Sequence, residues 1–452
     1  MTSAKAPKMY ISNSILLGII QYLREFAKAE TFIYDAVMKK VIYLDNASTT
    51  SVRPEVILAM KPYWSENFGN PSAITKMGVL AKQTIEKSRQ TVVETLFRRP
   101  NEIIFTSGGT ESNNLAIFGL VNYLERQERK ISSLHFITTN IEHSSVTECF
   151  KELERRGAKV DYLKVNEQGL VEPKDLRKLI KPNTVLVSIG YANNEIGTIQ
   201  PIRELAKEIR HARKNNKIPS ENSSERLGTP LSGEDFSDGI FPLFHTDASQ
   251  AGLWLDLNMN QLGVDLMTLD AQKMNGPKGA GVLFVRVGVN LSPIIFGGGQ
   301  EKGLRSGTEN VPLIVGLAKT FELARKDWGK KNKKMKIIRD YFWQKIQTKI
   351  PNAILNGGLE NRLPNNLNIS IPEINSEFLV LCLDEAGIFC STKSSCERDA
   401  EESFVVKALS REEWRAQTSL RFSLGENTTK KELDYVVNIL KNEVEKQKLA
   451  IF

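Results

Sequence analysis

The chain has 452 residues, of which 41% are hydrophobic and 25% charged, a composition typical of a globular protein that is too long for one ordinary domain. No apolar run reaches the roughly 20 residues that a membrane-spanning helix needs, so we do not expect an integral membrane protein. The formal net charge of +8 is spread over interspersed acidic and basic residues, which argues against direct nucleic-acid binding.

The first 40 residues are interpreted as an N-terminal extension, because their apolar stretch at residues 11–20 has no clear signal-cleavage site. They could form an amphipathic helix or precede a true start at Met38, and we favour the second interpretation.

From residue 41 onward, short β-branched runs alternate with helical periodicity. Strands are predicted at residues 41–44, 102–106, 135–138, 159–165, 184–191, 243–247, 266–269 and 281–286. Helices are predicted at residues 54–67, 79–97, 143–156 and 201–215. This alternation predicts an α/β fold with a largely parallel sheet, and a ligand crevice at the ends of its strands. We assign residues 41–308 to this large domain.

Residues 217–239 interrupt the alternation with Pro, Ser, Gly, Asn and acidic residues, and are predicted to form an exposed insertion. After Thr308 a helical pattern runs to about residue 350. A strand at 367–371, a helix at 377–386, a strand at 419–424 and a helix from Lys430 follow. Residues 309–452 are therefore predicted to form a smaller α+β domain.

Three polar motifs each follow a predicted strand. Residues 106–112 (TSGGTES) open a helix, and such a glycine-rich turn is either a phosphate cradle or an ordinary capped turn. Asp247 ends an apolar strand, where a carboxylate needs a cation such as a protonated pyridine, although a helix cap or a metal ligand is the alternative. Lys273 enters a Gly/Pro turn one strand later, where its amine can add to an aldehyde unless it is merely a surface charge.

Together with further motifs, these residues resemble the cysteine desulfurases (NifS/IscS-like) of the class V aminotransferase family. The resemblance extends from about Val41 to the C-terminus. The matching segments are residues 43–47 (YLDNA), 68–71 (FGNP), 106–112, 142–143 (EH), 193–197 (NNEIG), 247–250 (DASQ), 273–279 (KMNGPKG) and 305–308 (RSGT). The resemblance implies the fold of type I pyridoxal 5'-phosphate (PLP) enzymes, with a mainly parallel seven-stranded sheet and a homodimer whose active site lies at the subunit interface.

The resemblance also implies a role for each matched residue. Lys273 would form the Schiff base with PLP, Asp247 would pair with the ring nitrogen, and His143 would stack on the ring unless it is only a helix-start histidine. The phosphate would be held by Gly109, Thr110 and, from the partner subunit, Thr308. Asn194 and Gln250 would also bind the cofactor, as would Gln272 at a position where the family usually has His, and Asn70, Asn194 and Arg421 would bind the substrate.

Cys396 decides the reaction. It lies in a polar stretch, whereas Cys382 and Cys390 have apolar neighbours typical of a core. The resemblance implies that Cys396 takes the sulfur of L-cysteine as a persulfide, releases L-alanine, and passes the sulfur to an acceptor protein for iron–sulfur assembly or tRNA thiolation; an incidental surface thiol is the alternative. The cysteines and histidines have no zinc-type spacing, so no metal site is expected, and few cysteines in a long chain favour the cytoplasm.

The sequence departs from the family pattern next to the cofactor. Asp270 and Gln272 stand where the family usually has Ser and His, and a carboxylate there would repel a phosphate dianion unless it is turned away or neutralised. Lys393 and Ser395 replace a usual glycine and alanine before Cys396, and an ammonium group nearby could favour the thiolate.

Two other functions stay open at this point. One is another class V reaction, such as that of a selenocysteine lyase or an aminotransferase. The other is a weakly catalytic PLP-binding protein that acts as a sulfur-relay partner.

Overall fold

The computed structural model describes residues 41–215, 241–394, 402–410 and 412–450. The N-terminal extension, the predicted insertion at 217–239 and Cys396 therefore lie outside the described residues.

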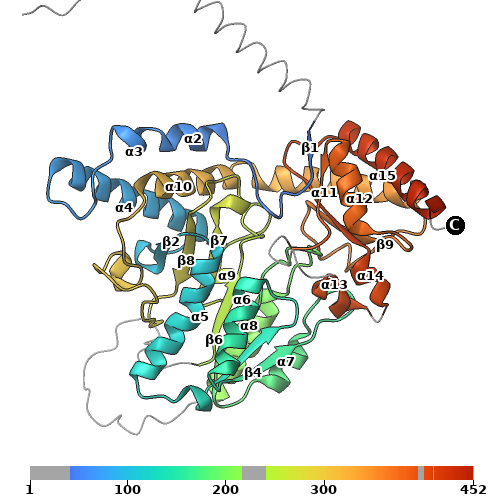
Figure 1. Cartoon of the computed structure of the whole chain (residues 1–452). Coiled ribbons are helices and arrows are strands. Elements are labelled where there is room, and N and C mark those ends of the chain that lie inside the picture. Colours follow the sequence, from blue (N-terminus) through green and yellow to red (C-terminus); the bar gives the residue numbers. More distant parts are fainter. Residues whose placement is uncertain (1–40, 216–240, 395–401, 411, 451–452) are drawn as a thin grey trace, which may run out of the picture.

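A seven-stranded sheet forms the centre of the molecule (Figure 1). The order of its strands is β2 (Ile103–Thr106), β8 (Gly281–Val285), β7 (Leu266–Asp270), β6 (Leu243–Asp247), β5 (Thr184–Ser188), β3 (His135–Thr139) and β4 (Lys159–Leu163). β8 runs antiparallel to β2 and β7, and all other neighbouring pairs are parallel. The mainly parallel sheet expected from the sequence is confirmed.

Helices cover both faces of this sheet because its strands are apolar on both sides. Along β8, Val282 and Phe284 join one apolar core, while Leu283 and Val285 join another. Helices α4 (Lys76–Leu96), α8 (Ile202–Asn215) and α10 (Val311–Arg325) contribute to the first core, together with the shorter α7 (Pro173–Leu179) and α9 (Met259–Leu262). Helices α5 (Gly109–Arg126) and α6 (Ser144–Arg155) contribute to the second.

A smaller antiparallel sheet lies in the C-terminal part, with the strand order β12 (Ser419–Ser423), β10 (Asn366–Ser370) and β9 (Ile354–Leu355). Around it lie α11 (Trp328–Lys349), α12 (Ser376–Glu385), α13 (Phe404–Leu409), α14 (Glu413–Gln417) and α15 (Lys430–Ala450) (Figure 1). β1 (Ile42–Tyr43) pairs with β11 (Ile388–Phe389), so the start of the described chain lies beside its C-terminal part. The division into two domains at residue 308 stays a prediction.

Two predicted helices are interrupted. The helix expected at 54–67 is divided into α2 (Pro54–Met60) and α3 (Pro62–Ser65), because Pro62 has no N–H group to continue the hydrogen-bond ladder. The helical pattern expected from 308 to 350 breaks between α10 and α11, where Lys326 is extended and Asp327 has a positive φ of 57°. Among the described residues, no helix is long and apolar enough to cross a membrane.

Candidate active site

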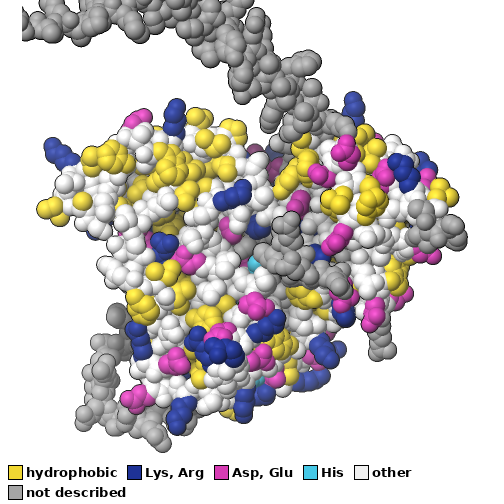
Figure 2. All heavy atoms as spheres, viewed as in Figure 1, with side chains coloured by type: hydrophobic (Ala, Val, Ile, Leu, Met, Phe, Trp, Pro, Cys, Tyr) yellow, Lys and Arg dark blue, Asp and Glu magenta, His cyan; other side chains and the backbone are white. Residues whose placement is uncertain are grey.

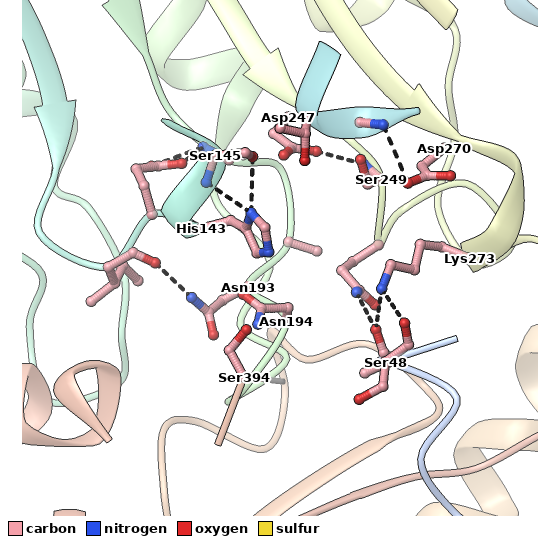
Figure 3. A pocket seen from close by; sticks show the side chains of 18 of the residues that line it. Ser48, His143, Ser145, Asn193, Asn194, Asp247, Ser249, Asp270, Lys273 and Ser394 are labelled. Carbon is pink, nitrogen blue, oxygen red and sulfur yellow. Dashed lines mark hydrogen bonds between the residues drawn. The ribbon is translucent and has the colours of Figure 1, made fainter. Parts of the chain in front are cut away.

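A cavity of about 200 Å³ opens at the carboxyl ends of the large sheet's strands (Figure 3). Such an edge is where open α/β sheets usually bind ligands. Loops that follow the strands of this sheet supply one wall, which includes Gly109, Thr110, His143, Asp247, Ser249, Gln250, Asp270, Gln272 and Lys273. Ala47, Ser48, Asn194, Ser394 and Arg421 contribute other parts of the lining. Most of the predicted site residues therefore line one cavity.

Asp247 is held in place at the end of β6. One carboxylate oxygen accepts a hydrogen bond of 2.9 Å from the Ser249 backbone N–H, and the other accepts one of 2.8 Å from the side-chain amide of Asn113. Asn113 lies on α5 and also donates to the Ser145 hydroxyl at 2.8 Å. Asn113 was not predicted as a site residue, although an Asn in helical register with the apolar Ile117 and Leu120 was a possible signal.

Lys273 follows β7 at the end of the short 3₁₀ helix η4 (Ala271–Lys273). Its Nζ donates hydrogen bonds to the backbone carbonyls of Ala47 at 2.8 Å and Ser48 at 2.5 Å. The side-chain amide of Gln250 donates to the same Ala47 carbonyl at 2.9 Å. The loop after β1 thus fixes the amine of Lys273 inside the cavity, and Lys273 is not a surface charge (Figure 3).

His143 is both the N-cap of α6 and part of the cavity wall. Its Nδ1 accepts a hydrogen bond of 3.1 Å from the Ser145 backbone N–H, which places the proton of a neutral imidazole on Nε2. His143 can therefore cap α6 and also face the cavity, because the cap bond uses only one of its two ring nitrogens.

The glycine-rich turn after β2 forms one end of the cavity. Gly108 has a φ of 149°, which residues other than glycine rarely adopt. A Cβ on Gly281 of β8 would lie only 2.6 Å from the Cα of Gly108, so Gly281 also has to be a glycine. This close packing holds the first turn of α5 against the sheet. The Ser249 hydroxyl oxygen is buried near Gly109 and has no hydrogen-bond partner among the described residues.

Asp270 is not turned away from this turn. It is only 5% exposed, and its Oδ2 accepts a hydrogen bond of 3.2 Å from the Gly109 backbone N–H. Gln272 donates to Asp270 twice, through its backbone N–H and through its side-chain amide, each at 3.1 Å. The two residues that depart from the family pattern are therefore in contact with each other.

Arg421 reaches the cavity from β12 of the smaller sheet. Its guanidinium donates to Asp45 at 2.8 Å, to the Ser48 hydroxyl at 2.7 Å and to the Asn194 carbonyl at 3.2 Å. Its Nε is buried without a hydrogen-bond partner among the described residues. Arg421 is thus a cation that three hydrogen bonds hold in place.

Glu195 connects the cavity to the residues that flank 395–401. It is fully buried, and its carboxylate accepts from the Ser394 backbone N–H at 3.0 Å and from the Ser403 hydroxyl at 2.6 Å. Loss of hydration on burial raises the pKa of this carboxyl, although the two donors and Arg421 favour its charged form. Glu195 belongs to the motif at residues 193–197, but no role was predicted for it from the sequence.

The three described cysteines have unreactive surroundings. Cys149 and Cys390 are buried, and burial raises the pKa of the Cys149 thiol to about 12 and also raises the pKa of the Cys390 thiol. Cys382 was expected in the core but is half-buried on α12, and its thiol pKa is also raised by desolvation. No described cysteine is therefore an activated thiol.

Two predicted site residues lie outside the cavity lining. Asn70 is in the turn before α4, where its side chain accepts from the Ser72 backbone N–H at 2.9 Å. Thr308 is exposed in the loop before α10, and its predicted role concerns a partner subunit. Both assignments stay predictions. Among the described residues, no cluster of His, Cys, Asp and Glu could hold a metal ion.

Sequence comparison identifies the class of protein. Residues 42–216 and 241–436 match the family described as Aminotransferase class-V, and the chain belongs to this family. Enzymes of the family use PLP as their cofactor.

Several similar proteins of this family are named cysteine desulfurase IscS, so the resemblance noted from the motifs is confirmed. The chain is 40% identical over 410 residues to "Cysteine desulfurase IscS" of Dictyoglomus turgidum, which covers 90% of this chain and 96% of that protein. It is 40% identical over 408 residues to the protein of the same name from Methanosarcina thermophila, covering 90% and 93%. A solved NifS-like protein is 34% identical with a TM-score of 0.78, and the match covers 90% of this chain and 99% of that one.

Proposed function

We propose that this protein is a PLP-dependent cysteine desulfurase that removes sulfur from L-cysteine, releases L-alanine, and holds the sulfur as a persulfide on Cys396. The observation that carries the proposal is the common cavity of Lys273, Asp247 and His143, with Arg421 also in its lining. Its relatives are named cysteine desulfurases, and a solved relative that is 31% identical with a TM-score of 0.68, covering 86% of this chain and 99% of that one, is described as SspA in complex with cysteine.

The residues of the cavity fit the cofactor at its ring end. Asp247 offers an oriented carboxylate for a pyridinium nitrogen, Lys273 offers an amine, and His143 offers a flat imidazole. Asn194 and Gln250 would address the ring oxygen. When bound, PLP would draw electrons from the substrate's α-carbon and so make its sulfur open to attack by a thiolate.

The phosphate end offers donors but also a carboxylate. The Gly109 N–H at the start of α5, the Thr110 hydroxyl and the unpaired Ser249 hydroxyl suit a phosphate group. Asp270 occupies the same place, with Gln272 bound to it. The fit is therefore complete at the ring end and opposed by one negative charge at the phosphate end.

Lys273 and Arg421 have different roles towards the substrate, namely proton transfer for Lys273 and binding of the carboxylate for Arg421. The Lys273 Nζ, once its proton has left, can take a proton from the substrate's α-carbon and return it. Arg421 orients the substrate through its carboxylate, for which the free Nε–H and the planar guanidinium are suited.

The choice of Cys396 as the sulfur carrier rests on the first two of the following observations, and the third weakens the expected effect of Lys393. The described cysteines have thiols with raised pKa values. Ser394, two residues before Cys396, lines the cavity. Lys393 is paired with Glu377 at 2.9 Å, so the effect of its ammonium on the thiol is partly offset.

Mass spectrometry after incubation with L-cysteine tests this proposal. The peptide that contains Cys396 should gain one sulfur atom, and Cys396→Ala should abolish both this product and sulfide release under reductant. Cys382→Ala is the matched control and should leave both unchanged, because Cys382 lies on α12 and is not part of the cavity lining. A wild-type protein that carries PLP but gains no sulfur on this peptide would contradict the proposal.

One specific observation favours the weakly catalytic alternative, namely the Asp270 carboxylate at the phosphate end. A weakly catalytic protein would bind PLP weakly, and addition of cysteine would leave the absorbance spectrum of the bound PLP unchanged. For a selenocysteine lyase or an aminotransferase, Cys396→Ala would retain activity on the true substrate. The absorbance spectrum with cysteine therefore tests the weakly catalytic alternative, and the activity of Cys396→Ala tests the other class V reactions.

A homodimer is the second part of the proposal, with Thr308 reaching the phosphate of the partner subunit. Exposed apolar side chains gather over α2, α3 and the start of α4 (Figure 2), where Leu58 is 67% and Ile74 98% exposed. A patch of this kind is typical of a subunit interface.

The variant Leu58→Ser/Ile74→Ser should shift the protein towards monomer in light-scattering measurements. The control is Phe378→Ser/Leu381→Ser on α12, which also removes two exposed apolar side chains. If both variants remain dimeric, this patch is not the interface. We propose that the sulfur acceptor is a scaffold protein or a tRNA-thiolation enzyme.

A further inference from the structure

The phosphate end of the cavity contains a fixed carboxylate. Asp270 is bound by three N–H donors, namely the Gly109 backbone and the backbone and side chain of Gln272. All three donors are uncharged, and no ion pair to Asp270 is found in the described part of the chain. Its negative charge is therefore stabilised without being neutralised.

This carboxylate uses the donor that a phosphate would use. The Gly109 N–H belongs to the first turn of α5, where N–H groups have no partner within the helix and favour an anion. Asp270 supplies that anion from within the protein. The unpaired Ser249 hydroxyl lies at the same turn and shows that the site still has a donor for a second, external anion.

Lys273 and Arg305, two cations near this end of the cavity, each bind groups other than Asp270. Lys273 donates to the carbonyls of Ala47 and Ser48, and Arg305 is bound to Glu111 on α5 at 3.0 Å. Asp247 lines the same cavity and adds a second negative charge. A phosphate that enters this end therefore meets a like charge that forms no ion pair with a described cation.

We infer that Asp270 is a specificity-determining residue that lowers the preference of this pocket for pyridoxal with a phosphate over pyridoxal without one. The inference rests on the proposed PLP site. The protein would hold its cofactor through the ring end more than through the phosphate. Gln272 is the supporting residue, because its two N–H groups keep the carboxylate in place.

Titration of the cofactor-free full chain with PLP and with pyridoxal tests the inference, with binding read from ligand absorbance and by calorimetry. Asp270→Asn keeps the shape and removes the charge, and Asp270→Ser restores the residue that the family usually has. Both variants should bind PLP at least about tenfold more tightly than the wild type, which corresponds to about 1.4 kcal/mol of binding free energy. Their affinity for pyridoxal should differ from that of the wild type by less than about threefold. Asp384→Asn on α12 removes an exposed carboxylate and should change neither affinity.

The possible failures are distinguishable. Equal PLP affinities of the wild type and Asp270→Asn, or equal gains for PLP and pyridoxal, would overturn the role of the charge while leaving the cofactor site intact. If neither ligand binds the wild type or the Asp270 variants at all, the proposed function fails, and the inference fails with it.

Discussion

The two walls of the cavity are built in different ways. The wall at the sheet edge carries Lys273, Asp247 and His143 on loops that leave buried strands, so the fold itself sets their positions. The opposite side depends on a network of polar contacts in which Arg421 and Glu195 bind groups far away in sequence. A wall fixed by backbone topology tolerates the loss of one contact better than a wall fixed by buried hydrogen bonds, since an unpaired buried group is costly.

The largest effect should follow from Lys273→Ala, which removes chemistry at the sheet wall without changing the fold. We expect the absorbance band of lysine-bound PLP to disappear and desulfurase activity to fall on the order of a thousandfold. Absorbance and circular dichroism measure the two consequences. Lys278→Ala, a few residues along the same loop, is the control that should retain the band.

Arg421→Lys should damage the opposite wall and spare the first. Lysine keeps the charge but cannot reach Asp45, Ser48 and the Asn194 carbonyl together with a planar fork. The KM for cysteine should rise by roughly tenfold to a hundredfold, while the affinity for PLP stays unchanged. If PLP binding falls as strongly as cysteine binding, the two walls are not independent.

Glu195→Gln should have a smaller effect on the same side. One amide oxygen can still accept from Ser394 or Ser403, but the amide nitrogen cannot accept from the other, so one buried donor loses its partner. We expect persulfide formation on Cys396 to slow by about tenfold with PLP affinity unchanged. Glu195→Ala should slow it further, and a Gln variant as slow as the Ala variant would mean that both bonds are needed.

The sequence predicted the sheet wall better than the opposite one. Asp247 and Lys273 each follow an apolar strand, and this local signal places them at one edge of any parallel sheet. The pairing of β1 with β11, the contact of Glu195 with Ser394 and Ser403, and the Asn113 bond to Asp247 all join residues far apart in sequence. No local pattern contains such contacts. Asp270 lies between these cases, because its charge was evident from the sequence whereas its bond to Gly109 was not.

The last expected effect is on stability and not on catalysis, and it concerns Glu142, a buried acid in the sheet wall beside His143. Its carboxylate accepts from the Thr139 hydroxyl at 2.7 Å and from the Gly190 N–H at 3.0 Å, but burial raises its pKa to about 7. The unfolded chain has a value of about 4.3 for this group. A raised pKa means that the stabilising contribution is present below about pH 4.3 and is lost as the pH rises through about 7.

Glu142→Gln is nearly isosteric and cannot ionise, so it should remove this pH dependence. Relative to the variant, the wild type should lose thermal stability between pH 5 and pH 7.5, by up to about 3 kcal/mol from the two pKa values. Melting temperatures at these two pH values measure the difference, and Glu385→Gln, an exposed acid at the end of α12, is the control. Parallel pH profiles for the wild type and Glu142→Gln would mean that Glu142 is charged in the folded protein throughout this range. The two hydrogen-bond donors would then offset its burial in full, and the sheet wall would carry a third fixed negative charge in addition to Asp247 and Asp270.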